Sequence, residues 1–293
     1  MSDQILQFLI TGLTTGAIYA LVALGFTIIY NASDVVNFAQ GEFVMMGAMM
    51  TIFLSADENG LPLFAAAVIA VIAVICVGLL LQRFAINLAR GASVVTTIII
   101  TIGASIFLRG VALVLWGKDF FAMPHFSGEQ PIHIGNATLL PQNLWVMGGT
   151  ALMVLAVHYF FHHTIQGKAI LACSYHRDAA SLMGINIQLM LLIAYGLSAL
   201  LGAMAGILVT PISFTSYDAG VMLGLKGFSA SILGGMGNPM GAIVGGLLLG
   251  LIESLAAGLI SSSYKDAIGF VILLLVLFIR PSGLMGKRSF ERV

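Results

Sequence analysis

The chain has 293 residues, of which 59% are hydrophobic and only 8% are charged, and its formal net charge is zero. Because an ordinary soluble domain carries about 25% charged residues, this composition excludes a soluble globular protein. The neutral balance also gives no electrostatic argument for binding nucleic acid. We therefore expect an integral membrane protein whose apolar side chains face lipid.

Apolar runs of membrane-spanning length follow one another along most of the sequence. A helix needs about 20 mainly apolar residues to cross a bilayer, and runs without two-residue alternation satisfy their backbone as helices rather than as barrel strands. The predicted fold class is all-α, a polytopic transmembrane helix bundle of about nine spans (eight to ten) in a single domain over residues 1–293. The predicted spans are 5–29, 35–54, 62–81, 94–116, 142–161, 188–209, 219–236, 239–260 and 266–280.

Lysine and arginine residues predict the orientation, because cytoplasmic loops carry an excess of them. Alternate loops and the C-terminal tail contain eight basic residues, whereas the other side has Lys118 and Lys265. We expect the basic side to be cytoplasmic, with the C-terminus inside and the N-terminus outside. The eight residues are Arg83, Arg90, Lys168, Arg177, Arg280, Lys287, Arg288 and Arg292.

Two polar segments, 31–42 and 234–241, look like interrupted helices. The first lies at the start of the second predicted span, and the second contains a proline between two apolar runs. Irregular backbone at membrane depth is tolerated only where it is buried in protein or lines a cavity, and broken helices bind solutes in many transporters. The alternative for both segments is a tight turn between spans. The candidate residues of a translocation path are Asn37, Gln40, Glu42 and Asn238.

Charges inside predicted spans form a second candidate site, because intramembrane charges are costly and seldom incidental. Arg109, Lys226 and Glu253 lie at a similar depth near the outer ends of their spans, whereas Glu42 lies about 10 Å from the cytoplasmic side. We expect Glu253 to pair with Lys226 or Arg109. Such a pair either fixes helix register or serves as a gate or a contact for a delivery protein.

Glycine is abundant, with 34 residues, and many glycines recur at a four-residue spacing within spans. This spacing returns to one face of a helix and lets another backbone approach closely. We predict that Gly237, Gly241 and Gly245 form such a packing face on a central helix.

The segment 162–187 is long, polar and partly helical. Asp178 is expected to cap a short helical turn that Gly184 ends. The apolar residues of this turn have no neighbouring span to cover them, so the segment predicts a docking surface. Those apolar residues are Ala180, Leu182 and Met183.

Several motifs occur in the same order as in a known family. They are 37–42 (Asn-Phe-Ala-Gln-Gly-Glu), 46–47 (Met-Gly), 167–186, 224–242, Glu253, 264–266 and 280–286. Together they resemble the permeases of branched-chain amino acid transporters and, more distantly, ribose-type sugar permeases. Gln40 stands where many members have histidine, Leu171 where arginine is usual, and Tyr175 and His176 replace an acidic pair. The departures at positions 171, 175 and 176 change the charge of the loop by which such permeases bind their ATPase subunit.

The resemblance implies the permease subunit of an ABC importer in a bacterial inner membrane. Its partners would be a related second permease, two cytoplasmic ATPase subunits and a periplasmic solute-binding protein. Residues 166–186 would form a coupling helix in a cleft of an ATPase, with Arg177 and Asp178 orienting it. Branched-chain or other hydrophobic amino acids are the implied solutes, and urea or short amides are the alternative.

The sequence lacks the motifs of catalysis, so we expect a transporter subunit and not an enzyme. Gly286-Lys287-Arg288 has arginine where a phosphate-binding loop needs a hydroxyl, so partner subunits would bind ATP and the chain would hold no cofactor. We also expect no metal site, because His158 and His162 fit interfacial anchors better. Two further classes remain, a passive channel with two half-helices and an ion-coupled secondary transporter.

Overall fold

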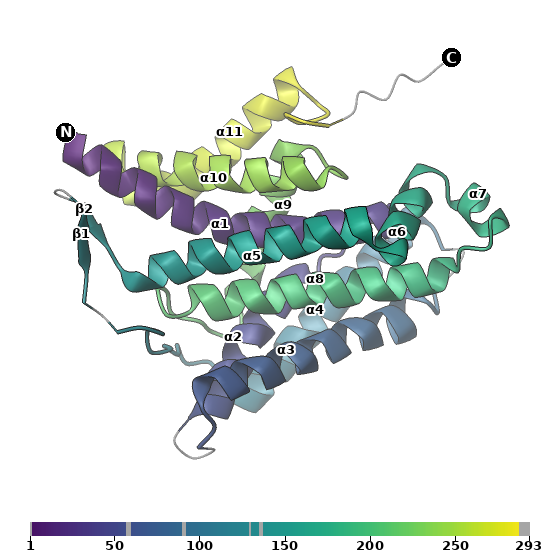
Figure 1. Cartoon of the computed structure of the whole chain (residues 1–293), viewed down its shortest axis with the longest axis horizontal. Coiled ribbons are helices and arrows are strands. Elements are labelled where there is room, and N and C mark those ends of the chain that lie inside the picture. Colours follow the sequence, from purple (N-terminus) through teal and green to yellow (C-terminus); the bar gives the residue numbers. More distant parts are fainter. Residues whose placement is uncertain (1, 57–59, 90–91, 129, 135–136, 287–293) are drawn as a thin grey trace.

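The computed structural model describes residues 2–56, 60–89, 92–128, 130–134 and 137–286. Long helices run side by side in one bundle (Figure 1), and seven helices of the described part are long and apolar enough to cross a membrane. The predicted polytopic helix bundle is therefore confirmed. Four basic residues used for the orientation lie outside the described residues: Arg90, Lys287, Arg288 and Arg292.

The helices α1 to α11 follow the predicted order, with a small hairpin between α4 and α5. Helix α7 projects beyond the bundle at one end, hereafter the α7 end, and the N-terminus lies at the opposite end (Figure 1). The elements are α1 (Ser2–Ser33), α2 (Gln40–Ser55), α3 (Leu63–Leu80), the π-helix η1 (Leu81–Ile86), α4 (Val94–Trp116), β1 (Ile132–Ile134), β2 (Ala137–Leu139), α5 (Pro141–His163), α6 (Ile165–Tyr175), α7 (Arg177–Leu182), α8 (Ile187–Val209), α9 (Ala219–Gly234), α10 (Pro239–Leu259), the 3-10 helix η2 (Ser262–Tyr264) and α11 (Lys265–Ile279).

The second predicted span is shorter than expected. Helix α1 continues to Ser33, and α2 begins only at Gln40, so six residues between them are not α-helical. Asp34 has a φ of +56°, a left-handed conformation that a right-handed helix cannot continue through. The Ser33 hydroxyl donates to the carbonyl oxygen of Ile29 at 2.8 Å, so the side chain of Ser33 bonds back into the last turn of α1.

Helix α1 is the central helix, and it packs antiparallel to α10 along a seam of small residues. A Cβ atom added at Gly250 would lie 2.3 Å from Cα of Gly16, and one at Gly246 would lie 2.5 Å from Cα of Ala20. No side chain fits at these positions unless the two backbones separate. In the apolar 18-residue stretch of α1, 89% of the residues are accordingly buried, whereas the share in the peripheral helix α4 is 17%.

The predicted glycine face on α10 is partly wrong. A Cβ atom at Gly241 or Gly245 would lie within 2.4 Å of a carbonyl oxygen of α9, so these two glycines do pack helix against helix. Gly237 lies before α10 and has a φ of +88°, so it serves a turn rather than a helix face.

The segment 234–241 is a tight turn between α9 and α10, and not an interrupted helix at mid-depth. The side chain of Asn238 accepts hydrogen bonds from the backbone N–H groups of Met240 (3.0 Å) and Gly241 (3.2 Å), which caps α10. Its amide nitrogen donates to the carbonyl oxygen of Met285 at 2.9 Å. Asn238 therefore holds the turn together, away from the other candidate path residues.

The glycine seam gives a stability prediction. Gly250→Ala forces α1 and α10 apart and should cost about 1–3 kcal/mol, as overpacking typically does. Gly103→Ala on α4 is the matched control, because a Cβ atom there meets nothing within 4 Å. Thermal unfolding of the purified protein in detergent should show a lower Tm for Gly250→Ala alone. Equal Tm values for the two variants would contradict the packing account.

Candidate translocation site

The segment 34–39 leads the chain back into the bundle, so that α2 begins at mid-depth. Gln40 is fully buried, and its amide nitrogen donates to the carbonyl oxygen of Ser198, about half-way along α8, at 3.1 Å. The Ser198 hydroxyl in turn lies within hydrogen-bond distance of the carbonyl oxygen of Gly25 (2.9 Å) and of the Gln40 side-chain oxygen. A side chain at Gly25 would collide with Gln40. These contacts hold the start of α2 between α1 and α8.

Helices α2 and α9 meet at glycines just beyond this point. A Cβ atom at Gly41 would lie 2.1 Å from the carbonyl oxygen of Gly220 and 3.0 Å from Cα of Gly224. This close backbone approach brings Glu42 next to the beginning of α9. The sequence pattern placed Gly41 in a motif but gave no sign of its partner.

Glu42 is 1% exposed and makes one strong contact. Its Oε1 accepts a hydrogen bond from the Ser105 hydroxyl at 2.7 Å and lies 3.6 Å from Nε of Arg109. Its other oxygen, Oε2, has no hydrogen-bond partner among the described residues, and neither does Nε of Arg109. Because Ser105 lies about half-way along α4, Glu42 is deeper in the bundle than the 10 Å that residue counting predicted.

A cavity of about 140 Å³ lies beside this pair, between α1, α2, α4 and α9. Its polar lining comes from Glu42, Ser105 and Arg109, and its apolar lining combines aromatic and aliphatic side chains. The fully buried Asn37 lies one turn away with an unpartnered side-chain nitrogen in the described structure. The structure thus gathers Asn37, Gln40 and Glu42 at the start of α2, whereas Asn238 lies elsewhere.

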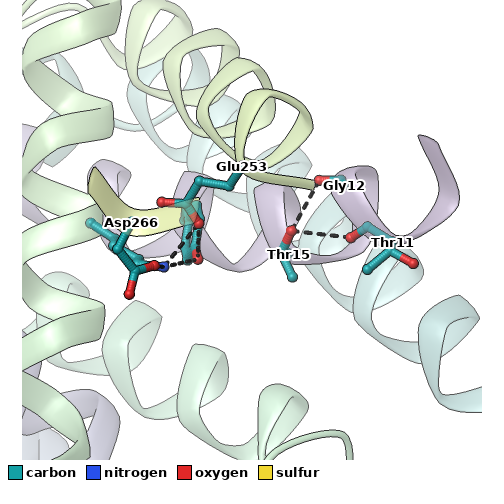
Figure 2. Close-up of polar contacts among 7 residues, drawn as sticks. Thr11, Gly12, Thr15, Glu253 and Asp266 are labelled. Carbon is teal, nitrogen blue, oxygen red and sulfur yellow. Dashed lines mark hydrogen bonds and ion pairs between the residues drawn. The ribbon is translucent and has the colours of Figure 1, made fainter. Parts of the chain in front are cut away.

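The predicted charge cluster is in fact two separate sites. Glu253 pairs with Lys226 at 2.9 Å, as one of the two expected pairings, but Arg109 belongs with Glu42. Arg109 was placed in the wrong cluster because counting residues gives the depth of a side chain in the membrane but not the helix face from which it projects. The carboxylates of Glu253 and Asp266, from α10 and α11, both turn toward the amino group of Lys226 (Figure 2).

Lys226 is the centre of this second site, and all three of its donors are used. Its Nζ donates to Tyr19 Oη (2.9 Å), Glu253 Oε2 (2.9 Å) and Asp266 Oδ1 (2.7 Å), and the Tyr19 hydroxyl donates to Glu253 Oε2 at 2.8 Å. Sequence reasoning missed Tyr19 and Asp266. Tyr19 shares a helical face with Gly12 and Gly16, which pack on α10, and that spacing was the available signal.

A second cavity, of about 310 Å³, adjoins this network between α1 and α10. Thr15 lines it and donates to the carbonyl oxygens of Thr11 and Gly12, so this hydroxyl is bound within its own helix (Figure 2). The network itself ties α1, α9, α10 and α11 together. The pairing of the buried Lys226 with carboxylates of two other helices is typical of an ion pair that fixes packing.

Helix α7 differs from its predicted form in two ways. His176, not Asp178, is the N-cap, because its ring nitrogen accepts from the backbone N–H of Ala179 at 3.3 Å. Ala180 is only 5% exposed and packs into the core, so it is not available for a docking partner. Leu182 and Met183 are 88% and 84% exposed.

The segment around α7 is otherwise attached firmly to the bundle. Gly184 ends it with a φ of +84°, as expected, while Asp178 is exposed. Arg177 donates from Nη1 to the carbonyl oxygen of Ser33, the last residue of α1, at 3.4 Å. Burial raises the pKa of the Cys173 thiol above its usual value, against the opposing charge of Arg177, so a reactive thiolate is disfavoured there.

Comparison with known proteins identifies relatives along the whole chain. Residues 8–277 match the family described as branched-chain amino acid transport system / permease component. The chain is 33% identical to the high-affinity branched-chain amino acid transport system permease protein LivH of Escherichia coli K12 over 100% of both chains. It is 32% identical to the corresponding protein BraD of Pseudomonas aeruginosa (98% of each chain) and 26% identical to the ribose import permease protein RbsC of Escherichia coli K12 (90% of this chain, 82% of RbsC).

The Lys226 network predicts a large loss of stability on truncation. Lys226→Met leaves the buried carboxylate of Glu253 without its cation, and breaking a buried pair in this way costs about 3–5 kcal/mol. Lys265→Met, at an exposed lysine, is the control. Thermal unfolding in detergent should show a marked loss of Tm for Lys226→Met and recovery of part of it when Glu253→Gln is added. A Tm equal to that of the parent would show that the pair does not stabilise the bundle.

Proposed function

Because the chain belongs to the branched-chain amino acid transport permease family, we propose that it forms the solute path of an ATP-driven importer in a bacterial inner membrane. Branched-chain or other hydrophobic amino acids are the proposed solutes, as the names of LivH and BraD suggest. The α7 end and the C-terminus face the cytoplasm in this proposal, in keeping with the basic residues of that side.

The observation that carries the proposal is the exposed apolar pair on α7. Leu182 and Met183 lie outside every candidate membrane span, at the end of a short helix that is anchored to the bundle through Arg177 and Ala180. A contiguous exposed apolar patch rimmed by polar residues marks an interaction site, and we infer that this adjacent pair is part of one. We infer that α6 and α7 seat in a cleft of a cytoplasmic ATPase and receive the movement that nucleotide binding produces there.

The remaining partners follow from the same assignment. ATP would be bound and hydrolysed by two ATPase subunits, and a periplasmic binding protein would deliver the solute to the opposite end of the bundle. A related second permease would cover part of the apolar periphery. This periphery is formed by α3, α4, α5 and α11, in whose apolar stretches only 11–22% of the residues are buried. Lipid would cover the rest.

The path itself is proposed to run along the interrupted segment before α2, where Asn37 and Glu42 retain unpartnered polar atoms in the described structure. Gln40 is fully bonded to Ser198 and serves to place α2. A passive channel with two half-helices would need a second broken helix at mid-depth, and Asn238 caps a turn instead. The geometry therefore favours the importer over such a channel.

Charged substitutions on α7 test the docking role. Leu182→Glu combined with Met183→Glu should abolish co-purification of the ATPase subunits and ATP-dependent uptake, because burying two unpaired carboxylates in an interface is costly. The fold should persist, since both side chains are exposed. The measurements are affinity co-purification and uptake of radiolabelled leucine into proteoliposomes.

Leu88→Glu is the matched control, because Leu88 is also 76% exposed in the neighbouring loop on the same side. It should leave both readouts at the parental level. Retained ATPase binding in the Leu182→Glu, Met183→Glu variant would refute coupling through α7. Solute movement by the isolated chain without ATPase subunits would refute the importer altogether.

A further inference from the structure

We propose that the cavity at the start of α2 is a transient site for the solute's zwitterionic group, with Glu42 receiving its ammonium group and Arg109 its carboxylate. The inference rests on the proposed function, since it concerns an α-amino acid on the path of an importer. It assigns opposite roles to the two partners of one loose ion pair.

The first argument is the free oxygen of Glu42. The side chain is 1% exposed, yet Oε2 has no hydrogen-bond partner in the described structure. It points toward α9, because a Cβ atom on the cavity-lining residue Gly220 would lie 3.0 Å from it. A buried carboxylate oxygen without a donor is costly. A solute ammonium group is a donor of matching charge.

The second argument is that the guanidinium of Arg109 is only partly engaged. Its Nε lies 3.6 Å from Glu42 without a hydrogen bond, and its Nη2 donates to the Ser105 hydroxyl at 3.4 Å. The side chain is 30% exposed. A guanidinium presents five donors in a planar fork that matches a carboxylate, so Arg109 retains donors for a second anion.

The third argument is the contrast with the Lys226 network. There, each of the three donors of the lysine has an acceptor within 2.9 Å, and Oε2 of Glu253 accepts from both Lys226 and the Tyr19 hydroxyl. The Glu42 pair leaves donors and an acceptor open beside a cavity. Completed bonding is typical of a structural pair, whereas open, convergent polar groups in a mainly apolar cavity are typical of a ligand site.

The walls of the cavity suit an aliphatic or aromatic side chain. Phe26, Phe38 and Phe228 line it, together with aliphatic residues of α4 and α9. Gly220 and Gly224 contribute backbone instead of side chains, which leaves the space open. A volume of about 140 Å³ is small beside the roughly 300–1,000 Å³ of sites for drug-sized ligands. The site therefore fits a single small amino acid and not a peptide.

Protection of a cavity cysteine tests the site in the complete transporter, reconstituted with its ATPase subunits, second permease and binding protein. Leu225→Cys, in a background with Cys76→Ser and Cys173→Ser, places a thiol at a half-exposed position that lines the cavity. Saturating leucine should slow its reaction with a small charged thiol reagent. Isoamylamine, which lacks the carboxylate, and 4-methylpentanoate, which lacks the ammonium group, should protect far less.

Variants that remove one charge then test which residue binds the ammonium group of the solute and which binds its carboxylate. Glu42→Gln should raise the leucine concentration for half-protection about tenfold or more, because a charge-assisted hydrogen bond is lost. Arg109→Gln should raise this concentration by a similar factor, because the carboxylate of leucine loses its cationic partner. Val111→Cys, on α4 and 37% exposed but not in the cavity lining, is the control and should not be protected.

The outcomes separate this inference from the proposed function. ATP-dependent leucine uptake without protection of either Leu225→Cys or a second cavity cysteine, Ile102→Cys, would overturn the site and leave the importer intact. Equal protection by leucine and isoamylamine would overturn the role of Arg109. Absence of ATP-dependent uptake in the parent would instead overturn the importer for this solute.

Discussion

The hydrogen bonds between Gln40, Ser198 and the backbone of Gly25 are the constraint on which the site depends. Non-helical backbone inside a membrane must be enclosed by protein, because lipid offers no hydrogen bonds. The segment 34–39 meets this condition only because Gln40 is held between α1 and α8, where a glycine leaves room for it. Helix α2 consequently starts at mid-depth and carries Glu42 there.

The two ionic sites illustrate opposite solutions to the cost of burying charge. At the Lys226 site, side chains from four helices converge, and all three donors of the lysine are used in hydrogen bonds to Tyr19, Glu253 and Asp266. The Glu42 site leaves part of its bonding capacity unused beside a cavity. The first arrangement suits a role in holding the bundle together, and the second suits the solute site that we propose.

The helical class, the order of the spans and the shortness of α7 followed from hydropathy and glycine signals, because these reflect local requirements of chain and solvent. Pairing of distant charges did not follow, as Arg109 shows: its partner is set by the rotation of α4 against α2. Gly237 and Ala180 were misread for a related reason. Periodicity does not reveal where a helix begins, nor whether a small residue faces partner or core.

Only a short stretch of chain connects the residue that α7 contacts with the proposed solute site at Glu42. Arg177 of α7 donates to the carbonyl oxygen of Ser33, and after six intervening residues the chain reaches Gln40 and then Glu42. The left-handed residue Asp34 makes this link a bend rather than a continuous helix. In the importer that we propose, movement of α7 would therefore act first on this bend, since α1 is locked to α10 by backbone contact and cannot shift alone. The bend and the polar cavity are thus adjacent in sequence, so a change of backbone angles at the bend would move Glu42 directly.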